Sequence, residues 1–379
     1  MKFLHLSDLH LGKRVNEFSM LDDQNEILKQ VLEIIDIEKP DGIFIAGDIY
    51  DKSIPSAEAV QLFDEFLCEL AKRHLHVFII SGNHDSPERI AFGSRIMDAS
   101  GIHLSPVYNG KIDPITMQDE YGAVNIYMLP FIKPSHVRRF YENEDIITYS
   151  DATRVALSSC TIDLSERNVL ITHQFVAGAI PCESEEIAVG GIERVDVSVF
   201  ADFDYVALGH IHGAQNCGSD HVRYCGTPLK YSFSETNHKK SVTVVELLAK
   251  GKLTVRTVPL VPARDMSEIC GTFAELTNPI YYTGNPITNN YLHITLTDED
   301  DIPDAIGRLR LIYRYLMRLD YDNSRTRAHN VITSAMDAET KSAYELFAEF
   351  FEMQNNVSMS DEQSTYMKDL IEKIEEEMA

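Results

Sequence analysis

The sequence predicts an α/β fold in which a sheet sandwich is flanked by helices. Two observations lead to this prediction. Short apolar runs typical of buried strands alternate with amphipathic helical patterns over the first 80 residues, and several of these runs end directly in polar side chains. The order strand, helix, strand, helix, strand predicts parallel strands joined by helical crossovers. Ligands of such sheets bind beyond the carboxyl ends of the strands, where we therefore expect a site.

The first three strands are predicted by the apolar runs at residues 3–6, 43–46 and 76–80. Between them, helical patterns run from about Met20 to Ile37 and from Ser56, a good capping residue, to about Arg73. This part of the chain is the clearest support for the parallel sheet.

Beyond residue 80, Ser86-Pro87-Glu88 predicts the start of a helix, with Ser86 as its cap and Pro87 in its first turn. The dipole of that helix would place positive potential beside His84. The later pattern predicts short strands within 102–132 with a turn at Asn109-Gly110, a helix at 150–160, strands ending at 172 and 208, and several strands within 220–258.

Polar residues of metal-ligand type follow five of the predicted strands. They are Asp8, His10, Asp48, Asn83, His173, His210 and His212. Any one such ending, taken alone, could simply meet solvent, whereas five in succession favour a ligand site. Carboxylate, amide and imidazole donors without thiolate suffice for two divalent ions if one carboxylate is shared. The sequence therefore predicts a dinuclear metal centre.

These motifs resemble a known superfamily. Asp8-x-His10, Gly47-Asp48, Gly82-Asn83-His84-Asp85, His173 and Gly209-His210-x-His212 are similar to the five motifs of the calcineurin-like metallophosphoesterases. Within it, Gly190-Gly191 with the acidic residues 183–186, the run 206–212 and the run 226–235 resemble the SbcD family, the nuclease subunits of bacterial SbcCD complexes. The motifs that carry the resemblance cover roughly residues 1–262. Beyond residue 262 the resemblance rests only on the order of the predicted parts along the chain.

The resemblance implies a ligand set and a mechanism. One ion would take Asp8, His10 and His212, the other Asn83, His173 and His210, and Asp48 would bridge them for in-line displacement at a phosphodiester. The preferred metal is manganese, with iron and zinc as alternatives. His84 would protonate the leaving oxygen or stabilise its charge, or else only support a ligand. Asp85 is expected to orient His84, and Asp51, where archaeal relatives often carry His, to be a supporting carboxylate.

Charge and composition constrain the partners. The net charge of −25 argues, by itself, against a nucleic-acid binder. Part of it is local, because residues 337–379 hold 12 acidic residues against 3 lysines. DNA contacts are nevertheless expected from Lys230, Tyr231, His238, Lys239 and Lys240, for which a strand with a solvated turn is the alternative. No signal peptide, membrane span or paired-cysteine motif is evident, so we expect a cytoplasmic protein with free thiols.

The chain is expected to form three parts: a nuclease domain at 1–262, a small α+β capping domain at 263–332 and helices at 333–379. The capping domain would hold a strand at 291–296 and a helix from Pro303 to Leu319 with Ile306, Leu309, Ile312, Tyr313 and Leu316 buried. Its arginines could face DNA or simply solvent: Arg308, Arg310, Arg314, Arg318, Arg325 and Arg327.

The tail is expected to carry two amphipathic helices. Tyr344, Phe347 and Phe351 form one stripe, residues 354–356 break it, and a capping box at Ser360-x-x-Gln363 starts the second helix. Such a small pair must cover its apolar face elsewhere. The resemblance implies that it binds the coiled-coil base of an SbcC-type ATPase within a homodimeric complex.

The sequence and the resemblance together predict a metal-dependent DNA exonuclease and endonuclease acting in DNA end and hairpin processing, repair, replication and recombination. Because no Walker motif is present, ATP dependence must come from the partner. Two alternatives stay open: a phosphodiesterase for nucleotides or other small phosphoesters, and a scaffold that keeps the fold without catalysis.

Overall fold

The computed structural model describes residues 1–185, 194–324, 326, 344, 347–348, 350–351 and 358–378. The chain divides into two compact units. The first comprises Met1–Cys270, Ala274–Ile294 and Asp304–Leu319, and the second comprises Gly271–Phe273, Thr295–Pro303 and Asp320–Ala379. Some residues singled out from the sequence lie outside the described residues. They are Gly190, Gly191, Arg325, Arg327 and the helix break at 354–356.

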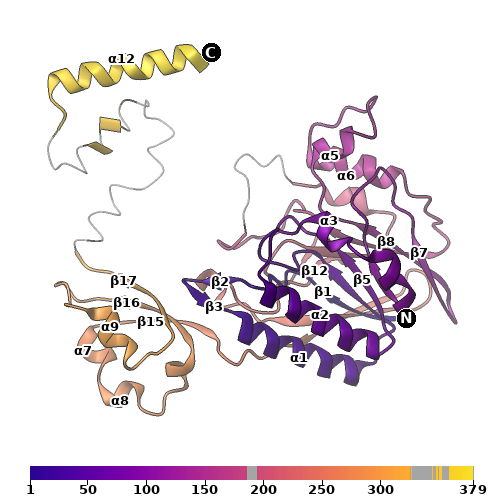
Figure 1. The fold of residues 1–379 in the computed structure, drawn as a ribbon, viewed down its shortest axis with the longest axis horizontal. Coiled ribbons are helices and arrows are strands. Elements are labelled where there is room, and N and C mark those ends of the chain that lie inside the picture. Colours follow the sequence, from indigo (N-terminus) through magenta and orange to yellow (C-terminus); the bar gives the residue numbers. More distant parts are fainter. Residues whose placement is uncertain are drawn as a thin grey trace. The chain divides into compact units, whose positions relative to one another are not determined.

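The first of two six-stranded sheets contains the three predicted N-terminal strands. Its order is β14 (Leu253–Pro259), β13 (Ser241–Leu247), β1 (Lys2–Leu6), β4 (Gly42–Ala46), β5 (His76–Ile80) and β6 (Ile102–Leu104). The last four are parallel, and β13 and β14 extend the sheet antiparallel. Helices α1 (Leu21–Glu38) and α2 (Ala57–Lys72) lie side by side and bury their apolar stripes in the cluster that covers this sheet (Figure 1).

The second sheet runs β11 (Gln215–Cys217), β12 (Ser219–Tyr224), β10 (Tyr205–Gly209), β9 (Arg167–His173), β8 (Gly122–Leu129) and β7 (Ile115–Asp119). Strands β12, β10, β9 and β8 are parallel, with antiparallel strands at both edges. Its outer face packs with α6 (Tyr149–Ser158), which begins at a capping box between Thr148 and Asp151. The helix predicted at 150–160 is thereby confirmed.

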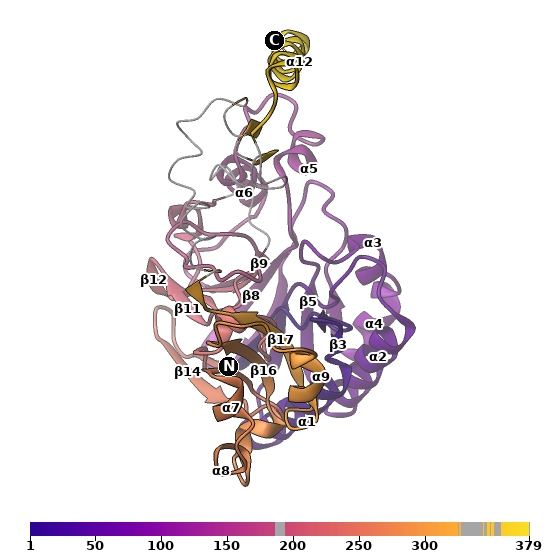
Figure 2. The ribbon, with the colours of Figure 1, turned by 90° about the vertical axis from the view of Figure 1, so that its left-hand side faces the viewer.

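The two sheets enclose a common apolar core. Phe3, Phe44 and Phe78 of the first sheet form one cluster with Ile126 and Val169 of the second, and all five side chains are fully buried. Figure 2 shows α2 on one side of β5, and β8 and β9 on its other side. The predicted sandwich flanked by helices is confirmed.

Two local predictions need correction. The helix after Ser86, α3 (Pro87–Ile90), is a single turn, so too few peptide dipoles align to give the field expected beside His84. Asn109-Gly110 forms a bend but joins no paired strands, because β6 and β7 belong to different sheets. The hairpin turn lies instead at residues 120–121, between β7 and β8.

The predicted helix at 303–319 is wrong in length. A three-stranded sheet has the order β15 (Met266–Gly271), β16 (Tyr291–Leu296) and β17 (Leu316–Tyr321), and only α9 (Ala305–Arg310) is helical. Asp304, at a φ of 50°, precedes the helix, and Leu316 is buried from a strand. Spacing alone did not distinguish these states, because a short helix followed by a strand also buries Leu309 and Leu316.

The remaining named elements are short. They are β2 (Arg14–Val15), β3 (Phe18–Ser19), α4 (Ser94–Met97), η1 (Asp98–Ser100), α5 (Pro134–Arg138), η2 (Val197–Phe200), η3 (Phe233–Glu235), α7 (Phe273–Leu276), α8 (Pro279–Tyr282) and η4 (Pro286–Asn289).

The second predicted tail helix is present as α12 (Asp361–Met378). Its capping box is formed as predicted: Gln363 donates its backbone N–H to Ser360 Oγ at 3.3 Å, and Ser360 donates its own to Gln363 Oε1 at 2.9 Å. Among the described residues, no helix is long and apolar enough to cross a membrane.

Candidate metal centre

The seven predicted ligands meet where five strands end. Asp8 and His10 follow β1, Asp48 follows β4 and Asn83 follows β5, all in the first sheet, whereas His173 ends β9 and His210 and His212 follow β10 in the second. Within the second sheet, Gly209 pairs with His173, which aligns the two strand ends. Residues from opposite sheets therefore line one site.

The backbone is strained at this site. Asp8, His10, Asp48 and His210 have φ values of 53°, 45°, 49° and 105°, in the region that L residues rarely adopt. Backbone hydrogen bonds hold two of them, from Asp8 to the Gly47 carbonyl and from His10 to the Asp48 carbonyl, each at 3.0 Å. Such strain persists only where the surrounding structure imposes it, and it concentrates at functional sites.

Two glycines allow the loops to approach closely. A Cβ on Gly82 would lie 2.1 Å from Asp48 Oδ1, and a Cβ on Gly209 would lie 1.9 Å from the Ala46 carbonyl oxygen. No side chain fits at either position unless its neighbours move. The motif glycines are thus required by the packing of the strand ends.

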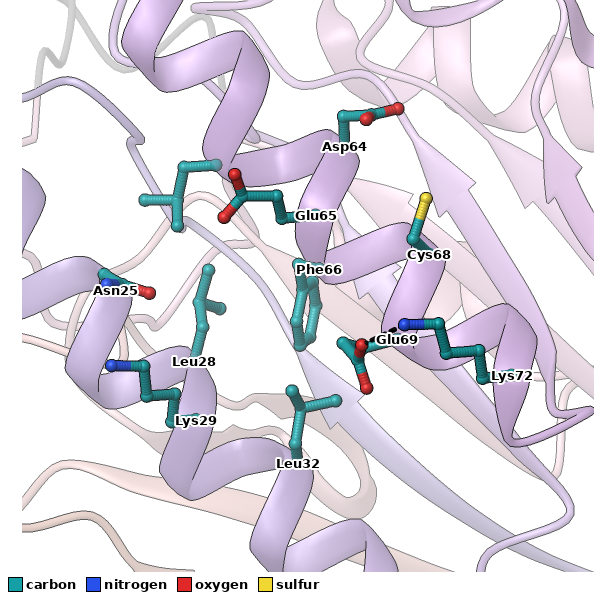
Figure 3. A pocket seen from close by; sticks show the side chains of 11 residues that line it. Asn25, Leu28, Lys29, Leu32, Asp64, Glu65, Phe66, Cys68, Glu69 and Lys72 are labelled. Carbon is teal, nitrogen blue, oxygen red and sulfur yellow. Dashed lines mark hydrogen bonds and ion pairs between the residues drawn. The ribbon is translucent and has the colours of Figure 1, made fainter.

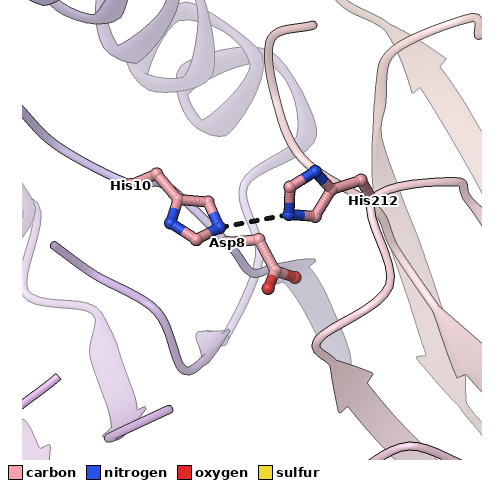
Figure 4. Close-up of side chains that lie close together, drawn as sticks. All are labelled: Asp8, His10 and His212. Atoms are coloured by element: carbon pink, nitrogen blue, oxygen red, sulfur yellow. Dashed lines mark hydrogen bonds between the residues drawn. The ribbon is translucent and has the colours of Figure 1, made fainter. Parts of the chain in front are cut away.

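Asp8, His10 and His212 form one half of the site (Figure 4). The Nε2 atoms of His10 and His212 lie 3.2 Å apart and face each other, and all three side chains are buried. Ser184 contacts the other ring nitrogen of His212, with its Oγ 2.8 Å from Nδ1. Nε2 of His212 is therefore the nitrogen available to bind a metal ion.

Asn83, His173 and His210 form the other half. Asn83 Oδ1 lies 3.0 Å from His173 Nε2 and 2.9 Å from His210 Nδ1. His173 donates its Nδ1–H to the Ala46 carbonyl at 2.8 Å, so its Nε2 points into the site. The fixed outer nitrogen is the usual arrangement of a metal-binding imidazole.

Asp48 is placed between the two halves. Its Oδ2 lies 3.3 Å from His173 Nε2 and 3.8 Å from His10 Nε2. Its Oδ1 accepts the backbone N–H of His84 at 2.9 Å. One buried carboxylate is therefore within reach of ligand atoms from both sheets.

The electrostatics of the cluster suit a bound cation. Burial, with the charge of Asp48, raises the pKa of Asp8 to about 6. Burial alone would lower the pKa of His173, but the charges of Asp48 and Asp8 outweigh it and raise that pKa to about 9. Burial lowers the pKa of His210 to about 3 and that of His10 well below its ordinary value, which keeps both imidazoles neutral.

These residues fit divalent metal ions. Neutral imidazoles, as at His10 and His210, and carboxylates are the ligand forms that such ions bind. At His173 a bound cation would replace the proton that the charges of Asp48 and Asp8 otherwise favour. The buried Nδ1 of His10 has no hydrogen-bond partner, and the facing Nε2 atoms of His10 and His212 have no acceptor but each other. A cation between the two Nε2 atoms would accept the lone pairs that face each other there.

His84 lies at the edge of this cluster. Its Nδ1 lies 3.0 Å from the Asp51 carbonyl oxygen, which can only accept, so Nδ1 carries the proton and Nε2 is free. Nε2 lies 4.0 Å from Asp48 Oδ2, and the side chain is 21% exposed. A free nitrogen between solvent and the ligand cluster can exchange a proton with a bound molecule.

The two predicted supporting carboxylates make different contacts. Asp85 accepts backbone N–H groups of Ile49, Tyr50 and Gly82 at 3.1, 3.0 and 2.9 Å, so it fixes the loops, whereas a backbone carbonyl orients His84. Burial and the charge of Asp48 raise the pKa of Asp85 to about 6. The Asp51 carboxylate pairs with Lys13 at 2.7 Å and lies 3.9 Å from His10 Nδ1.

Most of the predicted DNA contacts are inside the fold. Tyr231 is 3% exposed and donates to the Leu9 carbonyl at 2.6 Å, and Lys240 is 7% exposed and pairs with Glu235 at 2.5 Å. Lys230 pairs with Asp265 at 2.8 Å. His238 is half-buried, and Lys239 is the one of the five that is exposed.

Sequence reasoning missed the residues that support the ligand loops. Glu235, fully buried, accepts from Ser184, and Gln24 donates to the His10 carbonyl at 2.7 Å and to the Tyr231 hydroxyl at 3.0 Å. Glu235 ends the run at 226–235 that carried part of the resemblance, but no local pattern marks a glutamate as buried. Gln24 reads as an ordinary polar position of an amphipathic helix.

A separate hollow lies between α1 and α2 (Figure 3). It is lined by Leu28 and Lys29 of α1, by Phe66 and Lys72 of α2, and by their neighbours, with Lys72 paired to Glu69 at 2.6 Å. None of the seven predicted ligands lines it. The candidate chemistry therefore belongs to the strand ends.

Comparisons with known proteins give two family matches. The calcineurin-like phosphoesterase family matches residues 1–214, and the type 5 capsule protein repressor C-terminal domain matches residues 262–355. A curated relative from Staphylococcus epidermidis, named as the SbcD component of the nuclease SbcCD, is 33% identical over 378 residues, covering 98% of both chains. Its namesake from Staphylococcus saprophyticus is 33% identical over 348 residues, covering 90% of this chain and 91% of the relative. A solved dimetal phosphatase from Danio rerio is 14% identical, with a TM-score of 0.42, covering 69% of this chain and 97% of that one.

Proposed function

Because the chain belongs to the calcineurin-like phosphoesterases and, within them, to the SbcD nucleases, we propose that it hydrolyses phosphodiester bonds of DNA with two divalent ions. The observation that carries this proposal is the position of Asp48, whose Oδ2 lies within 4 Å of imidazoles from both halves of the cluster. Such an arrangement suits two ions that share one carboxylate.

The contacts among the proposed ligands assign them to two ions. Asp8, His10 and His212 would hold one ion, and Asn83, His173 and His210 the other, with Asp48 common to both. Oxygen and imidazole donors without thiolate favour Mn²⁺, while iron and zinc also accept this set. Bound ions would supply positive charge to the attacking and leaving oxygens of an in-line displacement.

His84 is the proposed catalytic side chain. With Nδ1–H held by the Asp51 carbonyl, a protonated His84 presents Nε2–H toward the reacting space, where it can donate to the leaving oxygen. Its backbone N–H also holds Asp48 Oδ1, so the acid is fixed relative to the proposed bridging carboxylate. Asp85 supports both loops through three backbone hydrogen bonds.

The remainder of the chain is proposed to serve DNA and a partner. We assign residues 1–262 to the nuclease domain, 263–332 to the capping domain and 333–379 to binding of an SbcC-type ATPase, within a homodimeric complex. The family match beginning at 262 supports the first boundary. A net charge of −25 favours a partner that supplies DNA affinity, and exposed Lys239 is the DNA contact that we retain.

The test compares cleavage of linear duplex DNA with hydrolysis of a small diester, bis-p-nitrophenyl phosphate, in Mn²⁺ with and without an SbcC-type ATPase and ATP. We expect both substrates to be cut, and EDTA to abolish both activities. Hydrolysis of the small diester alone, even with the partner present, would favour a phosphodiesterase for small esters. If the chain neither bound metal nor cut either substrate, the non-catalytic scaffold would be the remaining interpretation.

A further inference from the structure

A buried polar network lies behind His212, on the side away from His10. Glu235 is fully buried, and its Oε1 lies 2.7 Å from Ser184 Oγ and 3.3 Å from His212 Nδ1. Ser184 Oγ in turn lies 2.8 Å from His212 Nδ1. Because the serine hydroxyl donates to the carboxylate, its lone pair is left to accept the Nδ1–H of His212.

Lys240 neutralises this carboxylate inside the fold. Its Nζ lies 2.5 Å from Glu235 Oε2, and it also donates to the His212 carbonyl at 3.0 Å and to Thr227 Oγ1 at 2.5 Å. The backbone N–H of Tyr231 donates to Glu235 Oε1 at 3.2 Å. The carboxylate is therefore fully satisfied, and both the ring and the backbone of His212 are tied to the network.

The residue next to Ser184 also forms a hydrogen bond with His212. Glu185 Oε1 accepts the backbone N–H of His212 at 2.6 Å, and Glu185 Oε2 accepts that of Cys182 at 2.5 Å. Ser184 is thus held in place independently of its own hydroxyl. Its contact with Nδ1 is a fixed feature of the ligand loop.

We propose that Ser184 and Glu235 are positioning residues that hold His212 in the Nδ1–H tautomer and so set the metal affinity of the half-site formed by Asp8, His10 and His212. This inference rests on the proposed metal centre. The physical reason is that a ligand imidazole must present a free lone pair in one direction, and a serine–carboxylate pair on the opposite nitrogen fixes both the tautomer and the ring angle. Lys240 keeps Glu235 charged within the fold.

The remaining imidazoles provide an internal contrast. His173 donates its outer nitrogen to a backbone carbonyl, which no side-chain substitution removes. His10 has an outer nitrogen without a hydrogen-bond partner. Loss of the Ser184 hydroxyl should therefore weaken one ion and leave the ion held by Asn83, His173 and His210 unchanged.

The experiment is calorimetric titration of Mn²⁺ into the metal-free full chain. For Ser184→Ala we expect one of two binding steps to weaken by roughly 10-fold, the lower end of the usual range because Glu235 still lies 3.3 Å from Nδ1. Ser184→Thr, which restores a hydroxyl, should recover wild-type affinity. Ser158→Ala, whose hydroxyl only bonds the Val155 carbonyl on α6, is the matched control.

A second variant tests the role of the Glu235 carboxylate. Glu235→Gln alone leaves the buried Lys240 unpaired and could unfold the chain, so Glu235→Gln is combined with Lys240→Met. Glu268→Gln, which alters an exposed carboxylate 2.8 Å from His293, is its control. Wild-type affinity for both ions in Ser184→Ala and in the double variant would overturn the inference while the metal centre stands, as would a fall in metal-free stability without a change in affinity. Wild-type protein that binds no Mn²⁺ would overturn both proposals.

Discussion

At the scale of single residues, His84 is the side chain whose removal should separate catalysis from metal binding. It contributes no ligand atom to either proposed half-site, yet its Nε2 faces them. We expect His84→Ala to lower kcat for DNA and for the small diester by roughly 10²- to 10⁴-fold, the usual contribution of a general acid, with two Mn²⁺ ions still bound.

The matched control is His74→Asn, which changes an exposed histidine at a φ of 54° that asparagine tolerates. It should retain full activity. If His84→Ala lost an ion together with its activity, His84 would have to be reassigned as a supporting or ligand residue.

A different histidine predicts the pH dependence of stability. His5 is buried in the sandwich between the Tyr205 hydroxyl at 2.9 Å and the Leu208 carbonyl at 3.2 Å. Burial, with the charge of Arg223, lowers the pKa of His5 from 6.5 to about 3. The unfolded chain therefore binds more protons between these values, and stability falls as pH drops below about 6.5.

Between pH 7 and pH 5 we expect His5 to account for a loss of about 2 kcal/mol in the free energy of unfolding. The measurement is urea unfolding in EDTA at both pH values, for wild type and His5→Gln. The variant should lose about 2 kcal/mol less over this interval. Equal losses in the two proteins would contradict the burial of a neutral His5.

Residue types at strand ends were sufficient to predict the seven candidate ligands, because parallel strands bring their carboxyl ends together whatever the loop details. The supporting residues were not predictable in this way. Tyr231 and Lys240 looked like surface DNA contacts, yet each is buried by partners distant in sequence, Leu9 and His212. Burial of a lysine depends on whether its partners are themselves buried, and local sequence does not carry that information.

At the scale of elements, the loop after β5 is the most constrained. A Cβ at Gly82 would lie 2.1 Å from Asp48 Oδ1 and 2.5 Å from the Asp48 backbone nitrogen. We expect Gly82→Ala to displace Asp48 and to weaken Mn²⁺ binding by roughly 10- to 100-fold. The metal-free fold should remain, as judged by circular dichroism.

Gly251→Asn serves as the control for that variant. Gly251 lies in the turn between β13 and β14, at a φ of 74° with no atom within 4 Å of the added Cβ. Titration calorimetry should give wild-type affinity for it. Unchanged binding in Gly82→Ala would mean that Asp48 is not held as tightly as the loop packing indicates.

Helices and strands were predicted best where caps and periodicity agreed. Ser56 caps α2 by accepting from the Ala59 N–H at 3.2 Å, and the box of Ser360 and Gln363 starts α12. The failure at 303–319 has a physical cause. Leu309, Tyr313 and Leu316 are all buried, but α9 ends at Arg310 and β17 begins at Leu316, so helical spacing described burial without describing backbone conformation.

At the scale of the whole molecule, the sandwich was predicted from the pattern of strands and helices and the family from five motifs, and both are confirmed. Association was not predictable to the same degree, because surfaces that meet other chains obey no periodicity. On α12, Tyr366 is 67% exposed and Leu370 37% exposed. An amphipathic helix with such side chains in solvent suits a partner that covers them.

Truncation after residue 360 tests whether α12 serves partner binding and not hydrolysis. We expect the shortened chain to hydrolyse the small diester at the wild-type rate, because no proposed ligand lies beyond His212. Binding to an SbcC-type ATPase, measured by gel filtration of the purified pair, should be lost. Retained binding would place the partner surface elsewhere in the chain.

The dinuclear centre is tested most directly by anomalous diffraction from crystals of the full chain grown with Mn²⁺. We expect two anomalous peaks separated by roughly 3.5–4 Å, one against Asp8, His10 and His212 and the other against Asn83, His173 and His210, with Asp48 contacting both. A single peak, or two peaks of which Asp48 touches only one, would contradict the shared-carboxylate centre on which the proposed nuclease mechanism depends.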